Sequence, residues 1–134
     1  MKTGLISVSY DYVIDTSAWL EYINGTAKGL QIRTVIEREE IATSMIAIAE
    51  LADKLARNNK RFDITLQFIQ RRAAIIDLSV AIALHAAQLK KDSRRKSEKF
   101  SMADGIHLAT ARQEGAVLLT ADTDFAGLEN VRII

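Results

Sequence analysis

The sequence predicts an α/β fold in which helices cover a parallel β-sheet. Short runs of β-branched and aromatic residues alternate along the chain with longer stretches of helical pattern. Parallel strands need a crossover connection, usually a helix, so this alternation indicates a parallel sheet between helical layers. At 134 residues, 49% of them hydrophobic, the chain is the size of one domain with its own core. We expect a single domain over residues 1–134, with residues 1–11 as an N-terminal extension.

Five strands are expected from runs of apolar and β-branched residues bounded by turn or capping residues. The clearest runs are Tyr12-Val13-Ile14, which is followed by Asp15, and the apolar stretch 117–120. The predicted strands span residues 10–14, 41–42, 73–77, 117–120 and 131–134.

Helices are expected between these strands, and capping residues locate several of their ends. Gly115 ends one helix, Ser79 and Ser101 each begin one, and Thr43 or Ser44 begins another. The predicted helices span residues 18–23, 29–38, 44–58, 62–70, 79–89 and 101–115, with a short helical turn at 125–128. The charged stretch 90–99 is expected to form a loop.

Composition excludes several kinds of site. The chain has no cysteine, which excludes disulfides, zinc–thiolate sites and cysteine nucleophiles and suits a reducing cytoplasm. Lys and Arg number 18 against 17 for Asp and Glu, and this net charge of +1 indicates no particular partner. The first residues lack a signal-peptide pattern, and the most apolar stretch, 73–89, is interrupted by Asp77, Ser79 and His85. We therefore expect a cytoplasmic protein without a membrane span.

Four acidic residues stand where a parallel sheet would bring them together. Asp15 and Asp122 each follow a predicted strand, so both should emerge at the same edge of the sheet. Glu50 lies within a predicted helix, and Asp104 lies in the first turn of another. Close carboxylates raise one another's pKa, and a divalent cation removes this conflict. Oxygen ligands without Cys or a His pair favour Mg²⁺ or Mn²⁺, either of which can assist phosphodiester hydrolysis.

Asp15 and Glu50 also have simpler interpretations. Asp15 has the position of a helix N-cap. Glu50 and Lys54, like Asp53 and Arg57, are spaced as i,i+4 ion pairs on a solvated helix stripe. Helical periodicity alone favours the solvated stripe for Glu50, although the same face could border a wet cleft.

The remaining acids have structural alternatives as well. Asp104 follows Ser101 by three residues, the spacing of a capping box. Such a box is compatible with a catalytic role, because the positive helix end favours an ionised carboxylate. We expect one of Asp122 and Asp124 to be a turn residue.

Four short motifs resemble those of PIN domains, in the same order and at similar spacing. The first is Asp15-Thr16-Ser17 with the following helix, and the second is Thr43-Ser44 with Ala49-Glu50-Leu51. The other two are Ser101-Met102-Ala103-Asp104, running on to Ala111, and the stretch 119–125 that contains Asp122 and Asp124. Each motif is unspecific alone, but four in sequence spread over nearly the whole chain are fairly specific. A single-domain PIN protein most resembles the VapC-type toxin of VapBC toxin–antitoxin pairs.

The resemblance implies a three-layer α/β/α sandwich with a parallel sheet of four to five strands, and an endoribonuclease dependent on Mg²⁺ or Mn²⁺. On matching positions it implies a catalytic set of Asp15, Glu50, Asp104 and Asp122. The implied metal ligands are Asp15, Asp104, Asp122 and Asp124. The Thr16 and Thr120 hydroxyls would orient carboxylates or metal-bound water near the substrate. The family also implies a homodimer and a small DNA-binding antitoxin that plugs the cleft.

A basic stretch and a histidine complete the candidate residues. Arg94, Arg95 and Lys96 precede Asp104 and could bind RNA phosphates, although charged runs are usually solvated loops. His107 lies one helical turn after Asp104, and we interpret it as a helix-face histidine rather than a metal ligand.

Three functions stay open at this point. The first is a toxin-type ribonuclease, and the second is a PIN nuclease of RNA processing or decay without an antitoxin. The third is a non-catalytic PIN-like module that binds RNA or protein, in which the acids would form structural pairs and bind no metal.

Overall fold

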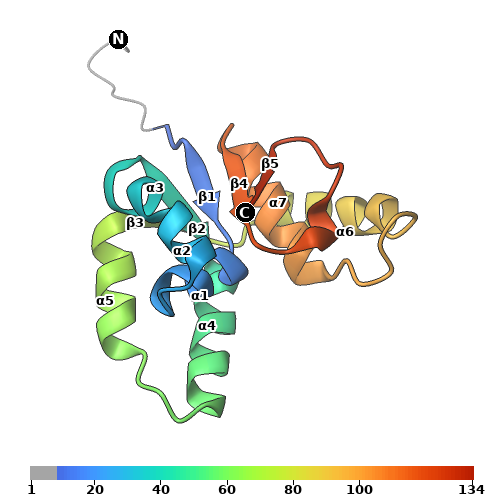
Figure 1. Ribbon diagram of the computed structural model, residues 1–134. Coiled ribbons are helices and arrows are strands. Elements are labelled where there is room, and N and C mark those ends of the chain that lie inside the picture. Colours follow the sequence, from blue (N-terminus) through green and yellow to red (C-terminus); the bar gives the residue numbers. More distant parts are fainter. Residues whose placement is uncertain (1–8) are drawn as a thin grey trace.

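The computed structural model describes residues 9–134 and contains a five-stranded parallel sheet (Figure 1). The strand order is β3-β2-β1-β4-β5, and each neighbouring pair runs parallel. The strands are β1 (Tyr12–Ile14), β2 (Ile41–Ser44), β3 (Ala73–Ile76), β4 (Val117–Thr120) and β5 (Val131–Ile133). The predicted parallel α/β fold is therefore confirmed. The carboxyl ends of β1, β2 and β4 lie side by side, because β1 pairs with both of the others.

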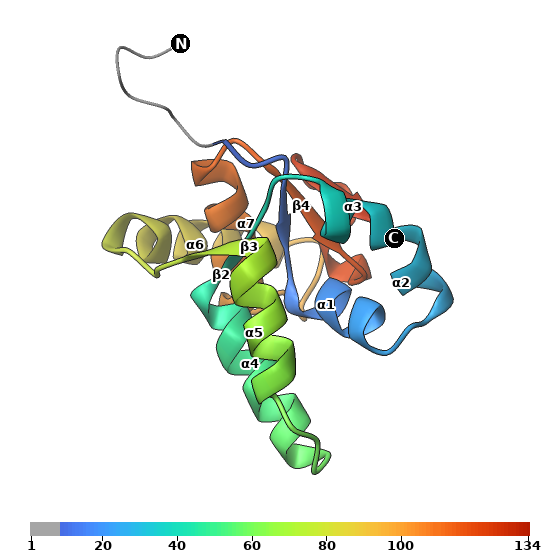
Figure 2. The same cartoon turned by 90° about the vertical axis from the view of Figure 1, so that its left-hand side faces the viewer.

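Helices form a layer on each face of the sheet. They are α1 (Thr16–Ile23), α2 (Ala27–Gln31), α3 (Arg33–Arg38), α4 (Met45–Arg57), α5 (Asp63–Arg72), α6 (Val80–Ser93) and α7 (Met102–Gln113), with the 3-10 turn η1 (Thr123–Phe125). Figures 1 and 2 show α6 and α7 on one side of the sheet and α1 to α5 on the other. In both views α4 and α5 extend well beyond the ends of the strands.

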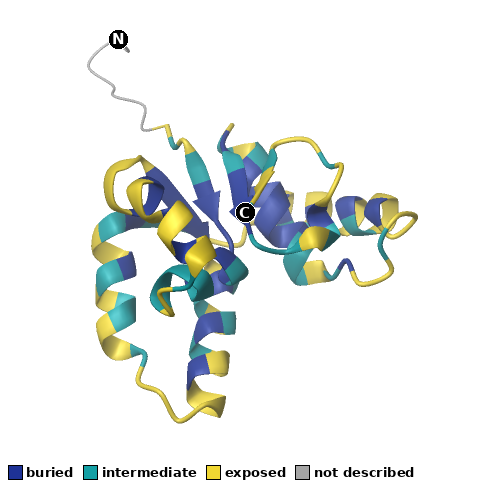
Figure 3. Ribbon diagram, viewed as in Figure 1, coloured by how far each residue is buried: buried dark blue, intermediate teal, exposed yellow. Residues whose placement is uncertain are grey.

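Alternation along the strands divides the apolar core between the two layers. Val13 and Leu118 pack with α6 and α7, whereas the next residues, Ile14 and Leu119, pack with α1, α3 and α4. Successive strand residues point to opposite faces of a sheet, so one short apolar strand fills both cores. The central strands β1, β2 and β4 are accordingly among the most buried parts of the chain (Figure 3).

The two histidine-bearing helices on the α6–α7 side approach each other closely. A Cβ atom at Gly105 of α7 would lie 2.5 Å from the backbone oxygen of Ala86 in α6. Glycine at this position lets the two backbones pack in direct contact. This contact holds the start of α7, which carries Asp104, against the rest of the domain.

Three predicted elements differ from the structure, and one of them is the helical turn expected at 125–128, which lies earlier, at Thr123–Phe125. The helix expected over 29–38 is interrupted at Ile32, where the backbone has φ −103° and ψ 3° and the side chain is fully buried. The charged loop begins only after Ser93, because α6 continues through Lys90 and Lys91. Lysine is a good helix former, and burial of Leu89 and Ser93 ties this last turn to the core.

The N-terminal residues lie partly outside the described part of the chain. Of the proposed N-terminal extension, residues 1–8 lie outside the described residues, and β1 begins at Tyr12. Over residues 9–134, none of the helices combines the length and apolar character needed to cross a bilayer.

Candidate active site

One cleft of about 400 Å³ collects all four of the predicted catalytic acids. Asp15 follows β1, Asp122 follows β4, Glu50 comes from α4 and Asp104 from α7. The cleft is lined by Asp15, Thr16, Ser17, Leu20, Glu21, Lys28, Glu50, Lys54, Asp104, His107, Ala121 and Asp122. These residues lie at the carboxyl ends of the central strands, the usual ligand-binding edge of a parallel sheet.

Asp15 is held rigidly and nearly out of contact with solvent. Its Oδ1 accepts hydrogen bonds from Ser17 Oγ (2.7 Å) and the Ala18 backbone N–H (2.9 Å), and its Oδ2 accepts one from Thr120 Oγ1 (2.6 Å). Asp15 therefore caps α1 as well as facing the cleft. Burial raises the pKa of Asp15, although the nearby His107 and the hydrogen bonds from Thr120, Ala18 and Ser17 oppose this effect.

Glu50 belongs to the cleft rather than to a solvated stripe. Its Oε1 accepts hydrogen bonds from Thr16 Oγ1 (2.5 Å) and from His107 Nε2 (2.9 Å). Burial acts to raise the pKa of Glu50, but the hydrogen bonds from His107 and Thr16, with the charges of His107 and Lys54, lower it overall. On the same helix, Asp53 and Arg57 do form the exposed i,i+4 ion pair, at 3.2 Å.

Asp104 combines a structural contact with a place in the cleft. Its backbone N–H donates to Ser101 Oγ (3.1 Å) and its Oδ2 accepts from the Ser101 backbone N–H (2.8 Å), which confirms the capping box. Burial raises the pKa of Asp104, and so does the nearby charge of Asp122, against the hydrogen bonds from Ser101.

Three carboxylates form a compact cluster suited to a cation. Asp104, Asp122 and Asp124 each offer an oxygen atom, and these atoms lie within 4.8 Å of one another. Asp122 caps η1 through the Asp124 backbone N–H (2.8 Å), as the turn interpretation predicted. Asp124 Oδ1 accepts a hydrogen bond from Ser97 Oγ (2.8 Å). Asp15 is not a member of this cluster, so the four predicted metal ligands divide into three clustered acids and one separate acid.

The residues predicted to bind substrate lie in two different places. Thr16 lines the cleft, where its hydroxyl donates to Glu50, whereas Thr120 is fully buried, donates to Asp15 and is not among the residues that line the cleft. The basic residues Arg94, Arg95 and Lys96 are exposed in the turn after α6 and are not among the residues that line the cleft. Arg94 Nε donates to the Phe100 backbone oxygen (3.0 Å), so this side chain also braces the turn.

Several residues of the cleft are not among the predicted site residues. Lys28 in α2 and Lys54 in α4 bring positive charge to the cleft wall, and Ser17 binds Asp15. His107, interpreted above as a helix-face residue, is buried and contacts Glu50 directly. Its spacing of one helical turn from Asp104 is the signal that points toward the cleft.

Solved structures share this architecture. A chain of a toxin–antitoxin complex from Klebsiella pneumoniae superposes with a TM-score of 0.74 at 24% identity, covering 91% of this chain and 96% of that one. VapBC2 from Rickettsia felis, bound to a promoter DNA fragment, gives 0.71 at 22% identity, with 92% and 96% covered. The sarcin–ricin loop cleaving toxin VapC20 of Mycobacterium tuberculosis gives 0.65 at 20% identity, with 91% and 99% covered. At these identities the likeness shows a common fold, which confirms the three-layer PIN-like architecture.

Comparison of sequences leads to the same family. No curated protein sequence matches the chain. The family model of the PIN domain, however, matches residues 12–130, which include every acidic residue of the cleft. The chain therefore belongs to the PIN domain family.

Proposed function

We propose that this protein is a divalent-metal-dependent endoribonuclease and the toxin of a type II toxin–antitoxin pair. The observation that supports this most strongly is the convergence of Asp15, Glu50, Asp104 and Asp122 on one cleft. Acids from four separate segments meet there, and none of them has a lysine or arginine within ion-pair distance among the described residues. Cytoplasmic RNA would be the substrate, and the cytoplasm the place of action.

The acidic cluster fits a hard divalent cation. Asp104, Asp122 and Asp124 supply only carboxylate oxygens, are half-buried and lie close enough to share one ion. We assign Mg²⁺ or Mn²⁺ to these three residues because such ions prefer oxygen ligands. A cation bound there would supply Lewis-acid activation of phosphate and water. Asp15 contributes its negative charge to the same site from a position fixed by Ser17 and Thr120.

Two groups of basic residues are candidates for contact with the RNA backbone. Lys28 and Lys54 lie on the wall of the cleft itself. Arg95 and Lys96 lie in the turn whose Ser97 is hydrogen-bonded to Asp124, so this turn is joined to the acidic cluster. We propose that phosphates beside the scissile bond contact the lysines and that more distant phosphates contact the turn.

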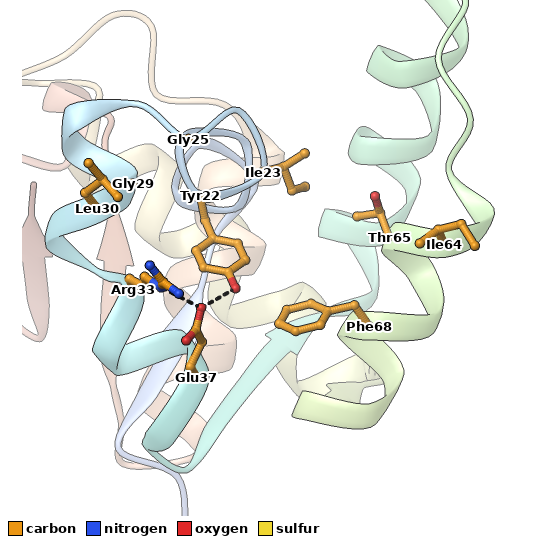
Figure 4. Close-up of a pocket in the computed structure, with 10 residues that line it drawn as sticks. All are labelled: Tyr22, Ile23, Gly25, Gly29, Leu30, Arg33, Glu37, Ile64, Thr65 and Phe68. Atoms are coloured by element: carbon orange, nitrogen blue, oxygen red, sulfur yellow. Dashed lines mark hydrogen bonds and ion pairs between the residues drawn. The ribbon is translucent and has the colours of Figure 1, made fainter.

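An apolar groove next to the cleft is our candidate site for the antitoxin. Figure 4 shows Tyr22 and Ile23 of α1 facing Phe68 and Ile64 of α5 across the groove, which has a volume of about 520 Å³ and is also lined by Leu30 of α2. Leu30 is 62% exposed and Ile64 is 67% exposed, and together with Ile23 and Phe68 they line one apolar groove of the kind that marks protein interaction sites. The Klebsiella and Rickettsia structures are toxin–antitoxin complexes, which supports a partner of this kind.

The other assignments of the sequence analysis remain proposals. These are the single domain over residues 1–134 and the homodimer. Exposed apolar side chains at Leu78, Val80 and Leu84 provide a candidate dimer surface. A PIN nuclease of RNA processing is the alternative if no antitoxin accompanies the chain. A non-catalytic module predicts that the acids are neutralised by structural pairs, which holds only for Glu50 and His107.

Replacement of single acids should abolish RNA cleavage without unfolding the protein. We expect Asp15→Asn and Asp122→Asn each to lower the cleavage rate by at least about 100-fold, because each removes a charge from the reacting site. The measurement is cleavage of a labelled RNA in Mg²⁺ or Mn²⁺, with circular dichroism to verify folding. Asp53→Asn, an exposed acid of α4, is the matched control and should retain activity. Full activity in Asp15→Asn would refute a role for that residue.

Metal binding should stabilise the wild-type protein more than a cluster variant. The pKa of Asp104 is raised on folding, so its ionisation opposes folding as pH rises above the ordinary value of 3.8. At neutral pH without metal, Asp104→Asn should therefore be at least as stable as wild type. Added Mg²⁺ at 100 times its Kd should stabilise wild type by about 2.7 kcal/mol. Thermal unfolding with and without the ion measures this, and an equal gain in Asp104→Asn would exclude the cluster as the site.

Salt dependence should identify the residues that contact RNA phosphates. In an Asp122→Asn background that leaves RNA intact, Lys28→Ala and Lys54→Ala should weaken binding and lower the slope of log K against log salt by ~0.7 per lost contact. Arg95→Ala and Lys96→Ala test the turn in the same assay. Lys60→Ala, exposed between α4 and α5, is the control of equal charge. If the variants of either pair, Lys28 with Lys54 or Arg95 with Lys96, give the same salt slope as the control, that pair does not contact RNA phosphates.

Charge in the apolar groove should prevent antitoxin binding. Leu30→Glu and Ile64→Glu should each weaken the complex with the antitoxin at least tenfold while the melting temperature changes little, because both side chains are exposed. The partner is the short DNA-binding protein encoded beside this gene, co-expressed and measured by calorimetry. Ala56→Glu, at an exposed position of α4 that does not line the groove, is the control. Unchanged affinity in both groove variants would place the antitoxin elsewhere.

A further inference from the structure

His107 is a buried polar residue at the centre of a hydrogen-bond network. It is 2% exposed, and its ring contacts side chains from three other segments. Nε2 lies 2.9 Å from Glu50 Oε1 and 3.4 Å from Thr16 Oγ1, and Nδ1 lies 2.9 Å from Ser44 Oγ. Nothing in the sequence motifs assigns a role to this residue.

The network itself indicates which ring nitrogen carries a proton. An ionised Glu50 only accepts hydrogen bonds, so Nε2 must be a donor to it. Ser44 Oγ lies 2.9 Å from Nδ1 and also accepts the backbone N–H of Ala47 (3.3 Å). The contact with Glu50 therefore places a proton on Nε2, whichever role Nδ1 has toward Ser44 Oγ. Ser44, which also caps α4, orients the imidazole, and the imidazole orients Glu50.

The two oxygens of the Glu50 carboxylate therefore have different surroundings. Both Thr16 and His107 donate to Oε1 of Glu50, whereas no described side chain donates to Oε2. The side chain of Glu50 is 36% exposed and lines the cleft, so Oε2 is the oxygen left for water or substrate. Two donors on one oxygen restrict rotation of the carboxylate more than one would.

We propose that His107 is a positioning residue that fixes Glu50 in the cleft by donating Nε2–H to Oε1. The catalytic part of this inference rests on the proposed nuclease function. His107 itself does not touch the reacting groups and acts through Glu50. A purely structural histidine, which only joins α7 to β2 and α4, would affect stability but not the orientation of Glu50.

Three substitutions separate these two roles. The Gln side chain in His107→Gln extends far enough to place an N–H near Nε2, whereas the shorter His107→Asn places its polar atoms near Nδ1. His107→Phe fills the volume without a donor. We expect kcat to fall about 10- to 100-fold in the Asn and Phe variants, because they lose the hydrogen bond that orients Glu50. KM should change little. The Gln variant should recover most of kcat.

A double variant that also replaces Glu50 tests whether His107 acts through that residue. If His107 acts through Glu50, His107→Asn should cost little further activity once Glu50→Gln is present. His85→Gln is the matched control, because His85 is an exposed histidine on α6 and should behave like wild type. Equal kcat in the Gln and Asn variants, or fully additive losses in the double variant, would overturn the proposal.

A spectroscopic measurement tests the contact between His107 and Glu50 without an activity assay. In ¹⁵N-labelled protein, the Nε2 resonance of His107 should have the shift of a protonated ring nitrogen, and this should persist without metal or RNA. An unprotonated Nε2 would overturn the proposal, since the imidazole would then offer no donor to Glu50. If wild-type protein cleaves no RNA but Nε2 is protonated, the nuclease function fails while the contact stands.

Discussion

The structure depends on keeping several carboxylates charged and close together. Each of these acids is bound mainly by neutral donors: backbone N–H groups and hydroxyls. Asp15 takes three such hydrogen bonds, and Asp104, Asp122 and Asp124 each take at least one. Neutral donors orient a carboxylate and stabilise its charge without cancelling it. The cleft therefore keeps a net negative field, and a bound cation is the simplest species that would neutralise it.

The same contacts also begin the helices that build the fold. Asp15 caps α1, Ser44 caps α4, and Ser101 with Asp104 caps α7. α1 and α4 start directly after β1 and β2, and the first turn of α7 carries Asp104 into the cleft, so the positive N-terminal ends of these helices lie near the cleft and favour anionic side chains there. Capping and catalysis are therefore compatible interpretations of the same acid. A site built in this way shares side chains with the helix starts, which links the folding of the domain to the placement of its acids.

Local signals predicted some features well and others poorly. The strand 117–120 and the Ser101–Asp104 box depend on neighbouring residues, and both are confirmed. Glu50 was ambiguous because helical periodicity separates faces of a helix but does not distinguish bulk solvent from a wet cleft. His107 was misjudged because its partners, Glu50 and Ser44, are 57 and 63 residues away in the chain. Contacts between residues so far apart in the chain depend on the order of the strands in the sheet, which a short sequence motif does not encode.

The acids of the cleft differ in environment, and their pKa values shift in different directions. Burial raises the pKa of Asp15 and Asp104, whereas hydrogen bonds from His107 and Thr16 leave the pKa of Glu50 lowered. Groups whose surroundings shift their pKa in opposite directions rarely share one role. Asp104 gains most from a nearby cation, because it faces the charge of Asp122 and lies in the cluster with Asp124. Glu50 stays ionised through contacts within the protein, and it can therefore act as a fixed acceptor before any ion or substrate arrives.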